Sequence, residues 1–434
     1  MKKARTLIVI ALIAFAWGCN KDDAPPTPKP ETVDKPEPEP EPENRAPGAF
    51  SLLEVKDKDT AVTLTPTFRW NTATDPDGDM VRYDLFLGKE ENALDSIITD
   101  LNTATHTIND RLSLFTEYFW QVKAKDSAGL ETVTDTLSFV TRRLNKPSSA
   151  TIPMADFAPR MLHTVTFFNG KLWLYGGQNK DGILVDVWSS DDGINWTNRA
   201  DPGFGPLRGH AAVSFQETLW FLGGRTTSSI DSRTNQIIPT IGIDENGSKF
   251  PAEWSARELH TAAVFQDKVW ILGGVGPNNE YLDEVWTSEN MTDWNEESAL
   301  PSGRFGHASV VFDNKLWVIG GFDGTDYLND VWYTADGATW TEATPNAPFL
   351  PRVSHAAVVH DNKIWLYGGD DPSRVFGDIW YSENGQDWTR FALEGNYERR
   401  VRPTLNALND QLLLIGGWDW DNPEKYYNDI WVFD

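Results

Sequence analysis

The chain has 434 residues and a formal net charge of −26, with 38 Lys and Arg against 64 Asp and Glu. This length exceeds what one hydrophobic core usually serves, so two or more domains are expected. The acidic balance excludes a nucleic-acid-binding protein, because such proteins need a basic surface. A self-repelling, acidic surface instead favours a soluble monomer.

The first 19 residues have the layout of a targeting segment. Three basic residues precede the apolar run 7–17, and Gly18-Cys19 follows. This resembles a bacterial lipoprotein signal peptide, which implies that Cys19 becomes the lipidated first residue and anchors the protein to a membrane. Cys19 is the only cysteine, so no internal disulfide is expected. The alternative is a plain secretory signal followed by a chance cysteine.

Residues 20–47 are predicted to form a linker. The segment 20–23 (NKDD) resembles the Lys-Asp-Asp export signal of Bacteroidetes-type surface lipoproteins. The resemblance implies an outer-membrane location in which the protein faces the cell exterior. The Pro/Glu run that follows favours an extended, semi-rigid spacer, because proline prefers polyproline II geometry and the glutamates repel one another.

Residues 48–142 are predicted to form a small all-β sandwich, because short alternating strands are separated by turn residues. The pattern resembles a fibronectin type III domain at core Trp70, at Leu112 six residues before Tyr118, and on the strand from Ala124 towards Gly129. The resemblance implies that Tyr118 donates or accepts a hydrogen bond with the upstream backbone. Spacing or presentation is the expected role of this domain.

Three aspartates in this domain form an Asp75-Pro-Asp77-Gly-Asp79 turn. Clustered carboxylates are the ligands that calcium prefers, so the turn is a candidate calcium site. The alternative is an ordinary Pro/Gly turn with solvated aspartates. No other cofactor is expected.

Residues 149–434 contain a motif that occurs six times, in which an apolar strand ends in two glycines. The first glycines of successive pairs are 47, 50, 47, 48 and 48 residues apart. The pairs are Gly176-Gly177, Gly223-Gly224, Gly273-Gly274, Gly320-Gly321, Gly368-Gly369 and Gly416-Gly417. A period of this size with about four short strands per unit predicts six blades of a β-propeller.

Each unit opens with an arginine close to a histidine. The pairs are Arg160/His163, Arg208/His210, Arg257/His260, Arg304/His307 and Arg352/His355, and the sixth unit has Arg402 without a histidine. With the glycine pairs and a recurring acid-x-Trp pattern, the units resemble kelch repeats. The expected fold class is therefore all-β, a six-bladed kelch-type β-propeller preceded by a fibronectin type III-like sandwich. The strand that completes blade six is expected from residues 150–154.

The six arginines admit two interpretations. They either form a basic axial pocket for an anion or pair with acids two residues before the strand tryptophans: Asp186, Glu284, Asp330, Asp378 and Asp429. Blade two has Thr240 instead of the acid, which leaves one arginine free under the second interpretation. Arg208 and Arg257 are therefore kept as candidate ligand contacts. Histidines that recur with the blade are expected to be structural.

Features that break the repeat are the better guides to function. Blade two has an extended loop from Arg225 to Pro239, and Trp254 lies in the connection to blade three. Blade six has Trp418-Asp419-Trp420-Asp421 directly after its glycines. Aromatic rings beside carboxylates favour a glycan or protein ligand on this loop face. The alternative is that these tryptophans fold onto their own blades.

A non-enzymatic, surface-exposed binding module is the favoured function. The alternative is a carbohydrate-active propeller enzyme, sialic acid epimerase-like or sialidase-like, since kelch propellers include such enzymes. A galactose-oxidase-type copper site needs a cysteine cross-linked to a tyrosine, and the only cysteine is Cys19. A sialidase nucleophile, a tyrosine with its glutamate, is not identifiable. No catalytic residue is therefore assigned.

Overall fold

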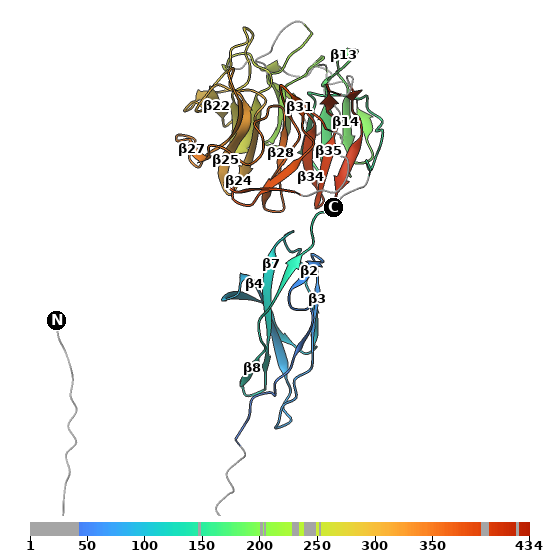
Figure 1. Ribbon diagram of the computed structural model, residues 1–434, viewed down its shortest axis with the longest axis vertical. Coiled ribbons are helices and arrows are strands. Elements are labelled where there is room, and N and C mark those ends of the chain that lie inside the picture. The colour runs from blue at the N-terminus through green and yellow to red at the C-terminus, as the bar shows by residue number, and fades with distance from the viewer. Residues whose placement is uncertain are drawn as a thin grey trace, which may run out of the picture.

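The computed structural model describes residues 43–145, 149–199, 203, 205–227, 234–237, 249–250, 253–391, 399–421 and 425–434. The regular elements of these residues are all β-strands, and no helix there is long and apolar enough to cross a membrane. The predicted signal peptide, Cys19 and most of the linker lie outside the described residues. Figure 1 shows a broad disc of strands standing on a slender sandwich.

The sandwich consists of two sheets, ordered β1-β3-β6 and β2-β9-β7-β4-β5, with β8 paired to β7. Its strands are β1 (Leu52–Glu54), β2 (Asp59–Val62), β3 (Thr67–Trp70), β4 (Arg82–Glu90), β5 (Ala93–Leu101), β6 (Thr105–Thr107), β7 (Glu117–Lys125), β8 (Glu131–Val133) and β9 (Leu137–Thr141). Every second residue of β7 from Tyr118 to Ala124 is buried, as expected for a strand with one face on the core. Trp120 of β7 packs on Phe68 of β3, with ring centroids 4.7 Å apart.

The hydrogen bond predicted for Tyr118 is present. The hydroxyl of Tyr118 accepts a hydrogen bond from the backbone N–H of Ser113 at 3.1 Å. Trp70 is buried in the same core. The assignment to the fibronectin type III family remains a prediction.

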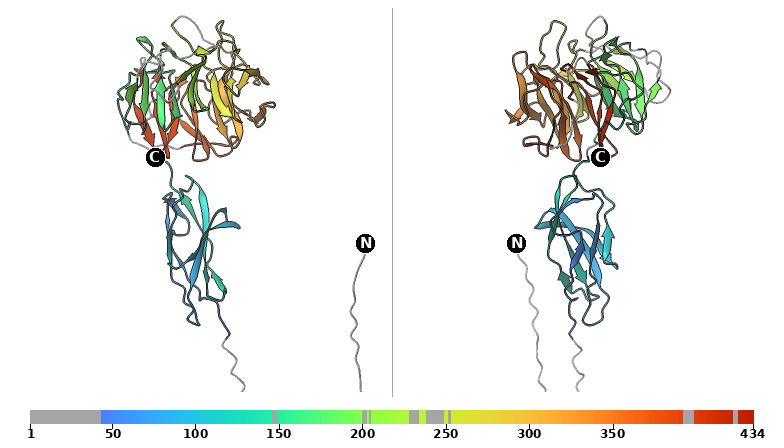
Figure 2. Two further views of the ribbon diagram at one scale, coloured as in Figure 1. Left: turned by 180° about the vertical axis from the view of Figure 1, so that it is seen from behind. Right: turned by 45° about the vertical axis from the view of Figure 1, so that its right-hand side comes forward.

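The disc consists of six blades arranged around a central axis, and Figure 2 shows the blades edge-on. Blade one has β10 (Thr164–Phe168), β11 (Lys171–Tyr175), β14 (Val187–Ser190) and β15 (Thr197–Arg199), and blade two has β16 (Ala211–Phe215), β17 (Thr218–Leu222), β18 (Thr234–Ile237) and β19 (Lys249–Phe250). Blade three has β20 (Thr261–Phe265), β21 (Lys268–Leu272), β22 (Val285–Ser288) and β23 (Asn295–Glu296). Blade four has β24 (Ala308–Phe312), β25 (Lys315–Phe322), β26 (Tyr327–Thr334) and β27 (Thr341–Thr344).

Blades five and six complete the disc. Blade five has β28 (Ala356–His360), β29 (Lys363–Tyr367), β32 (Ile379–Ser382) and β33 (Trp388–Arg390), and blade six has β34 (Thr404–Leu408), β35 (Gln411–Ile415) and β38 (Ile430–Phe433). Short hairpins lie on the loops: β12 (Gln178–Asn179) with β13 (Gly182–Ile183), β30 (Asp370–Asp371) with β31 (Arg374–Val375), and β36 (Trp418–Asp419) with β37 (Lys425–Tyr426). The inner strand of blade one, β10, lies against the inner strand of blade six, β34.

The seam of the ring differs in detail from the predicted fourth strand. Ile152 and Ile430 exchange two backbone hydrogen bonds, at 3.0 and 2.8 Å, and form a single bridge. The hydroxyl of Thr151 accepts the next hydrogen bond, from the backbone N–H of Val432 at 3.2 Å. Residues 150–154 therefore close blade six through one bridge and a side chain, not through a full strand.

The glycine pairs let neighbouring blades approach closely. Gly368 has φ +69°, and a Cβ there would lie 2.5 Å from the carbonyl oxygen of Arg400 in the next blade. The N–H of Gly369 donates to the same carbonyl at 3.1 Å. A left-handed backbone in this close contact requires glycine, which explains the repeat.

The sandwich docks on the end of the propeller where the β28–β29 turn lies. Phe115 stacks on Tyr381 at 5.5 Å and meets Phe391 edge-on at 5.5 Å. Asp361, at that turn, forms an ion pair with Arg111 at 2.8 Å. The strand β28 begins at the opposite end, so the residues that precede the inner strands lie on the face away from the sandwich (Figure 1).

Candidate functional site

The recurring feature of the blades is a buried ion pair, as one of the two interpretations expected. In blade five, Arg352 is fully buried and donates to the carbonyl of Gly368 at 2.9 Å and to Asp378 at 2.8 Å. The indole of Trp380 donates to the same carboxylate at 2.7 Å. The equivalent pairs are Arg160 with Asp186, Arg257 with Glu284, Arg304 with Asp330 and Arg400 with Asp429.

Arg257 is therefore not a ligand contact. Its side chain is buried and paired with Glu284, and it also donates to the carbonyl of Gly273 at 2.9 Å. The candidate assignment of Arg257 to an anion site is wrong because the guanidinium is already fully engaged inside the blade.

Two blades have a different register from the one predicted. In blade six the paired arginine is Arg400, not Arg402. In blade two the corresponding position is Leu207, whose carbonyl accepts the inter-blade bond from Gly177 at 2.9 Å. Arg208 thus lies one residue later than the paired arginines, and Arg402 two residues later. Thr240, expected to leave an arginine free, lies outside the described residues.

The residue two positions after each paired arginine, or after Leu207, belongs to a ring around the axis. This axial ring consists of Leu162, Gly209, Leu259, Gly306, Ser354 and Arg402, and all six have a left-handed backbone with φ between 54° and 61°. Each N–H from Gly209 onward donates to the ring carbonyl of the preceding blade at 2.7 to 3.1 Å. These bonds hold a narrow collar in a backbone conformation that non-glycine residues rarely adopt.

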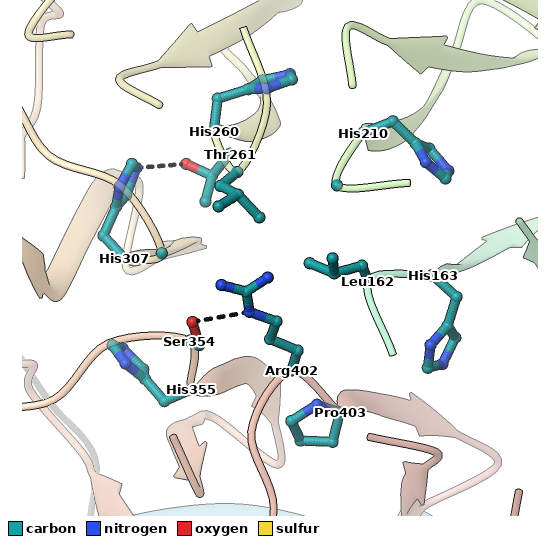
Figure 3. Close-up of a pocket in the computed structure, with 13 residues that line it drawn as sticks. Leu162, His163, His210, His260, Thr261, His307, Ser354, His355, Arg402 and Pro403 are labelled. Carbon is teal, nitrogen blue, oxygen red and sulfur yellow. Dashed lines mark hydrogen bonds between the residues drawn. The ribbon is translucent and has the colours of Figure 1, made fainter. Parts of the chain in front are cut away.

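A pocket of about 230 Å³ lies at the axial ring, lined by the ring residues, the blade histidines, Thr261 and Pro403. Figure 3 shows Arg402 and Leu162 pointing into it. Burial lowers the pKa of His307 to about 3, and the same cause acts on His163, His210, His260 and His355. The imidazoles are therefore neutral at physiological pH, and Arg402 is the charged side chain among the described residues that line this pocket.

Arg402 has few partners for a charged group. Its Nε donates to the hydroxyl of Ser354 at 3.2 Å. No carboxylate of the described residues lies within ion-pair distance of it. Burial lowers the pKa of Arg402, while the charges of Asp370 and Glu258 oppose that shift and Arg208 adds to it.

The mouth of the pocket is bordered by residues that bridge to the segment after each glycine pair. Arg208 bridges to Arg225, Val353 to Asp370 and Val401 to Trp418. The predicted ligand residues Arg208, Arg225 and Trp418 are thereby placed around one opening, although they come from blades two and six.

Arg208 and Arg225 share one carboxylate at this mouth. Glu258 accepts from Arg225 at 2.7 Å and lies 3.7 Å from Arg208. Arg208 also donates to the side-chain carbonyl of Gln178. Among the described residues on this side of the mouth, two cations therefore share one acid.

The blade-six motif divides into two parts. Trp420 donates its indole N–H to Asp370 of blade five at 3.0 Å, across the blade boundary. Burial raises the pKa of Asp370 to about 6, against the lowering effects of Trp420 and Arg402.

Trp418, Asp419 and Asp421 contact residues of blade six and of the segment that leads into it. Trp418 stacks on Tyr426 at 6.0 Å, and its indole nitrogen is buried with no hydrogen-bond partner among the described residues. Asp419 is buried, and Arg399 lies 3.9 Å from it and 3.0 Å from Asp421. Trp420 is thus the member that faces a neighbouring blade.

Sequence reasoning missed an aromatic group at the same mouth: Tyr281, Phe305, Phe322 and Tyr327. Tyr281 stacks on Phe305 at 5.7 Å and remains 39% exposed, and Phe322 packs on Tyr327 at 4.9 Å. Phe305 bridges to Phe322 at the same repeat position as Arg208 to Arg225. Only correct alignment of that position across blades identifies these residues.

Two other predicted sites are contradicted. Trp254 is 1% exposed and packs against Trp294 at 6.0 Å in the core, so its ring cannot contact a ligand. Asp75 accepts hydrogen bonds from the N–H groups of Asp77 and Asp79, and Asp77 pairs with Arg45 at 2.7 Å. Among the described residues no three metal-binding side chains gather, so this segment is a turn and not a calcium site.

Comparisons with known proteins agree with the architecture. Residues 259–434 match the family model described as the KLHDC2/KLHL20/DRC7 Kelch-repeats domain. The chain is 34% identical over 158 residues to beta-scruin of Limulus polyphemus, a match covering 33% of this chain and 17% of that protein. It is 29% identical over 154 residues to a leucine-zipper-like transcriptional regulator 1 homolog of Drosophila melanogaster, covering 32% and 15%.

A solved structure, that of YjhT, superposes with a TM-score of 0.54 at 17% identity, covering 65% of this chain and 96% of that chain. The chain spans less than a fifth of the length of the curated relatives it matches. The likenesses establish the fold: all-β, with a kelch-type β-propeller.

Proposed function

We propose that this kelch-type propeller is a non-enzymatic binding module that takes a glycan or protein ligand at the axial mouth. The observation that carries the proposal is Arg402. At the ring position where the other blades have Leu, Gly or Ser, blade six has a cation directed into the pocket. A charged group at a site where burial disfavours charge is more often kept for recognition than for stability.

The surroundings of Arg402 are those of a recognition site. Tyr281 is 39% exposed, and Asp370 places a carboxylate whose charge acts on Arg402. Aromatic faces contact apolar surfaces of ligands, and placed polar groups determine their orientation. The face lies away from the sandwich, which agrees with presentation outward from an anchor on Cys19 (Figure 2).

Binding is tested with the purified full chain on a glycan array and against candidate surface proteins, with Trp420→Ala as the mouth variant. Phe167→Ala is the matched control, because Phe167 is an exposed aromatic near the other end of an inner strand. We expect Trp420→Ala to weaken binding at least about tenfold, and Phe167→Ala to leave it unchanged. Equal binding by both variants and the wild type contradicts the proposal.

A carbohydrate-active enzyme is the second candidate, and one observation favours it. Asp370 is a buried carboxyl with a pKa raised to about 6, next to the pocket, and such groups serve as general acids or bases. Turnover of sialylated oligosaccharides by the wild type, lost in Asp370→Asn, would support the enzyme and overturn the binding-only function.

The surface anchor is tested separately. Cys19→Ser is expected to abolish labelling by a fatty-acid analogue and to release the chain from the membrane fraction. Protease accessibility of the propeller on intact cells would support an outward orientation, and protection would contradict it.

A further inference from the structure

Positively charged side chains gather at the mouth, although the molecule as a whole is negatively charged. The whole chain carries a formal charge of −26. Yet three arginines, Arg208, Arg225 and Arg402, border one opening. Among the described residues, the carboxylates whose charges act on Arg402 are Glu258, shared by two of the arginines, and Asp370. A cleft with an excess of one sign concentrates ligands of the other.

The axial ring fixes the position of one of these charges, that of Arg402. The backbone N–H of Arg402 donates to the ring carbonyl of Ser354 at 2.8 Å, and its side-chain Nε donates to the hydroxyl of the same residue at 3.2 Å. The remaining guanidinium N–H groups point into a pocket of about 230 Å³. A planar guanidinium offers paired donors that match a carboxylate. A pocket of this size has room for the end group of a ligand.

The rest of the mouth selects the kind of end group. Tyr281 is 39% exposed and can contact the apolar face of a sugar, and the carboxylate of Asp370 can accept a hydrogen bond from a hydroxyl. Glu258 is buried and already held by Arg225 and Arg208. A ligand that uses all three chemistries carries a carboxylate, several hydroxyls and a flat apolar face.

We propose that the axial pocket binds the carboxylate of an acidic sugar end group, and that Arg402 is the residue that recognises it. This inference rests on the proposed binding function and adds the ligand class. An acidic peptide satisfies the charge but not the hydroxyl acceptors, and it is therefore an outcome of the test.

The residues at the same ring position in other blades indicate which substitution of Arg402 the fold tolerates. Leu162 and Leu259 occupy the same ring position with φ 60°, so Arg402→Leu places a residue that this backbone already accepts. The fold is expected to remain intact, and its stability to remain unchanged or to rise, because a desolvated charge is removed. Arg69→Leu is the matched control, since Arg69 is an exposed arginine on the sandwich and the change in charge is the same.

Calorimetry with the full chain uses glucuronate and galacturonate, the neutral hexoses glucose and galactose, and a short Asp/Glu peptide. We expect the wild type and Arg69→Leu to prefer the uronates over the hexoses by at least about tenfold, and Arg402→Leu to lose this preference. Equal affinity for uronates and hexoses, a preference that survives in Arg402→Leu, or Arg402-dependent binding of the peptide alone overturns the inference.

The binding measurements distinguish a wrong ligand class from a wrong binding function. If neutral glycans bind in a manner that depends on Trp420 while the uronates gain nothing, the ligand class is wrong and the binding function stands. If no mouth variant alters any binding, the proposed function itself is wrong.

Discussion

The guanidinium of Arg400 donates two hydrogen bonds to the carboxylate of Asp429, at 2.7 and 3.1 Å, and both groups are buried. The indole of Trp431 donates to the same carboxylate at 2.8 Å. This triad links the start of a blade to its third strand. Because it recurs around the ring, it belongs to the fold, and Arg402, two residues further on, is left for another role.

Breaking one such pair is expected to destabilise the propeller strongly. Asp330→Ala leaves Arg304, whose side chain is 1% exposed, without its counter-charge. Removal of one partner of a buried ion pair costs about 3–5 kcal/mol, because the remaining charge stays desolvated. Chemical denaturation measures the loss. Asp181→Ala is the control, since that aspartate is exposed and its ion pair with Lys180 is exposed too, and a change within about 0.5 kcal/mol is expected. A cost below about 1 kcal/mol for Asp330→Ala contradicts the assigned role.

The buried histidines of the blades predict that the propeller loses stability as the pH falls. The folded state keeps the imidazole of His307 neutral because burial lowers its pKa from 6.5 to about 3, so an unfolded imidazole takes up a proton in that window and a folded one does not. The contribution to stability is therefore full above about pH 6.5 and is lost as the pH falls towards 3, at about 1.4 kcal/mol per pH unit for each proton.

Proton uptake measures this effect directly. Unfolding between pH 6 and 4 is expected to take up about one proton per blade histidine. His307→Gln, which retains a partner for the hydroxyl of Thr261, is expected to reduce the uptake by about one proton. An uptake identical to that of the wild type would show that His307 titrates normally in the folded protein.

Substitutions at two glycines distinguish the cost of a left-handed backbone from the cost of steric overlap. Gly170 has φ +75° and no atom within 4 Å of the position that a Cβ would occupy, whereas a Cβ on Gly369 would meet the carbonyl oxygen of Val353 at 2.6 Å. Gly170→Ala is expected to cost about 1–2 kcal/mol from the left-handed backbone alone. Gly369→Ala is expected to cost about 3 kcal/mol or more, because overlap adds to strain. Equal thermal shifts for the two variants would exclude a packing role for the glycine pair.

The contact between sandwich and propeller predicts coupled behaviour. Phe115→Ala combined with Asp361→Ala removes the aromatic stack on Tyr381 and leaves Arg111 without this partner. We expect one thermal transition in the wild type to split into two, and small-angle scattering to show a wider range of shapes. Leu130→Ala, on an exposed part of the sandwich, serves as the control. Unchanged scattering from the double variant would mean that the interface contributes little to the relative placement of the domains.

Much of the fold is predictable because the chain repeats. The glycine pairs identify the ends of the second strands, since a left-handed backbone pressed against the next blade excludes side chains there. Buried Phe68, Trp70 and Trp120 follow from strict alternation in the sandwich, and the hydrogen bond of Tyr118 follows from a family resemblance.

The candidate site was less accessible to prediction. In the segments around Arg208 and Arg402, several residues compete for the same repeat position, and only backbone hydrogen bonds identify which one is paired. Trp254 breaks the repeat and is nevertheless buried, because an irregular connection can still pack onto its own blade. The contact of Phe115 with Tyr381 joins segments more than two hundred residues apart, and no local sequence pattern predicts such a contact.

The single bridge between Ile152 and Ile430 also has a mechanical meaning. The chain enters the propeller beside this seam, and Asn145 donates to the carbonyl of Asp434 at 2.6 Å before the chain reaches the bridge. The sandwich also grips the β28–β29 turn through Asp361, and Arg142 donates to the carbonyl of Asp434 at 2.8 Å. Tension is thereby shared between blade five and the chain terminus. A force applied between the sandwich and the propeller would therefore load this joint before it reached the bridge between Ile152 and Ile430.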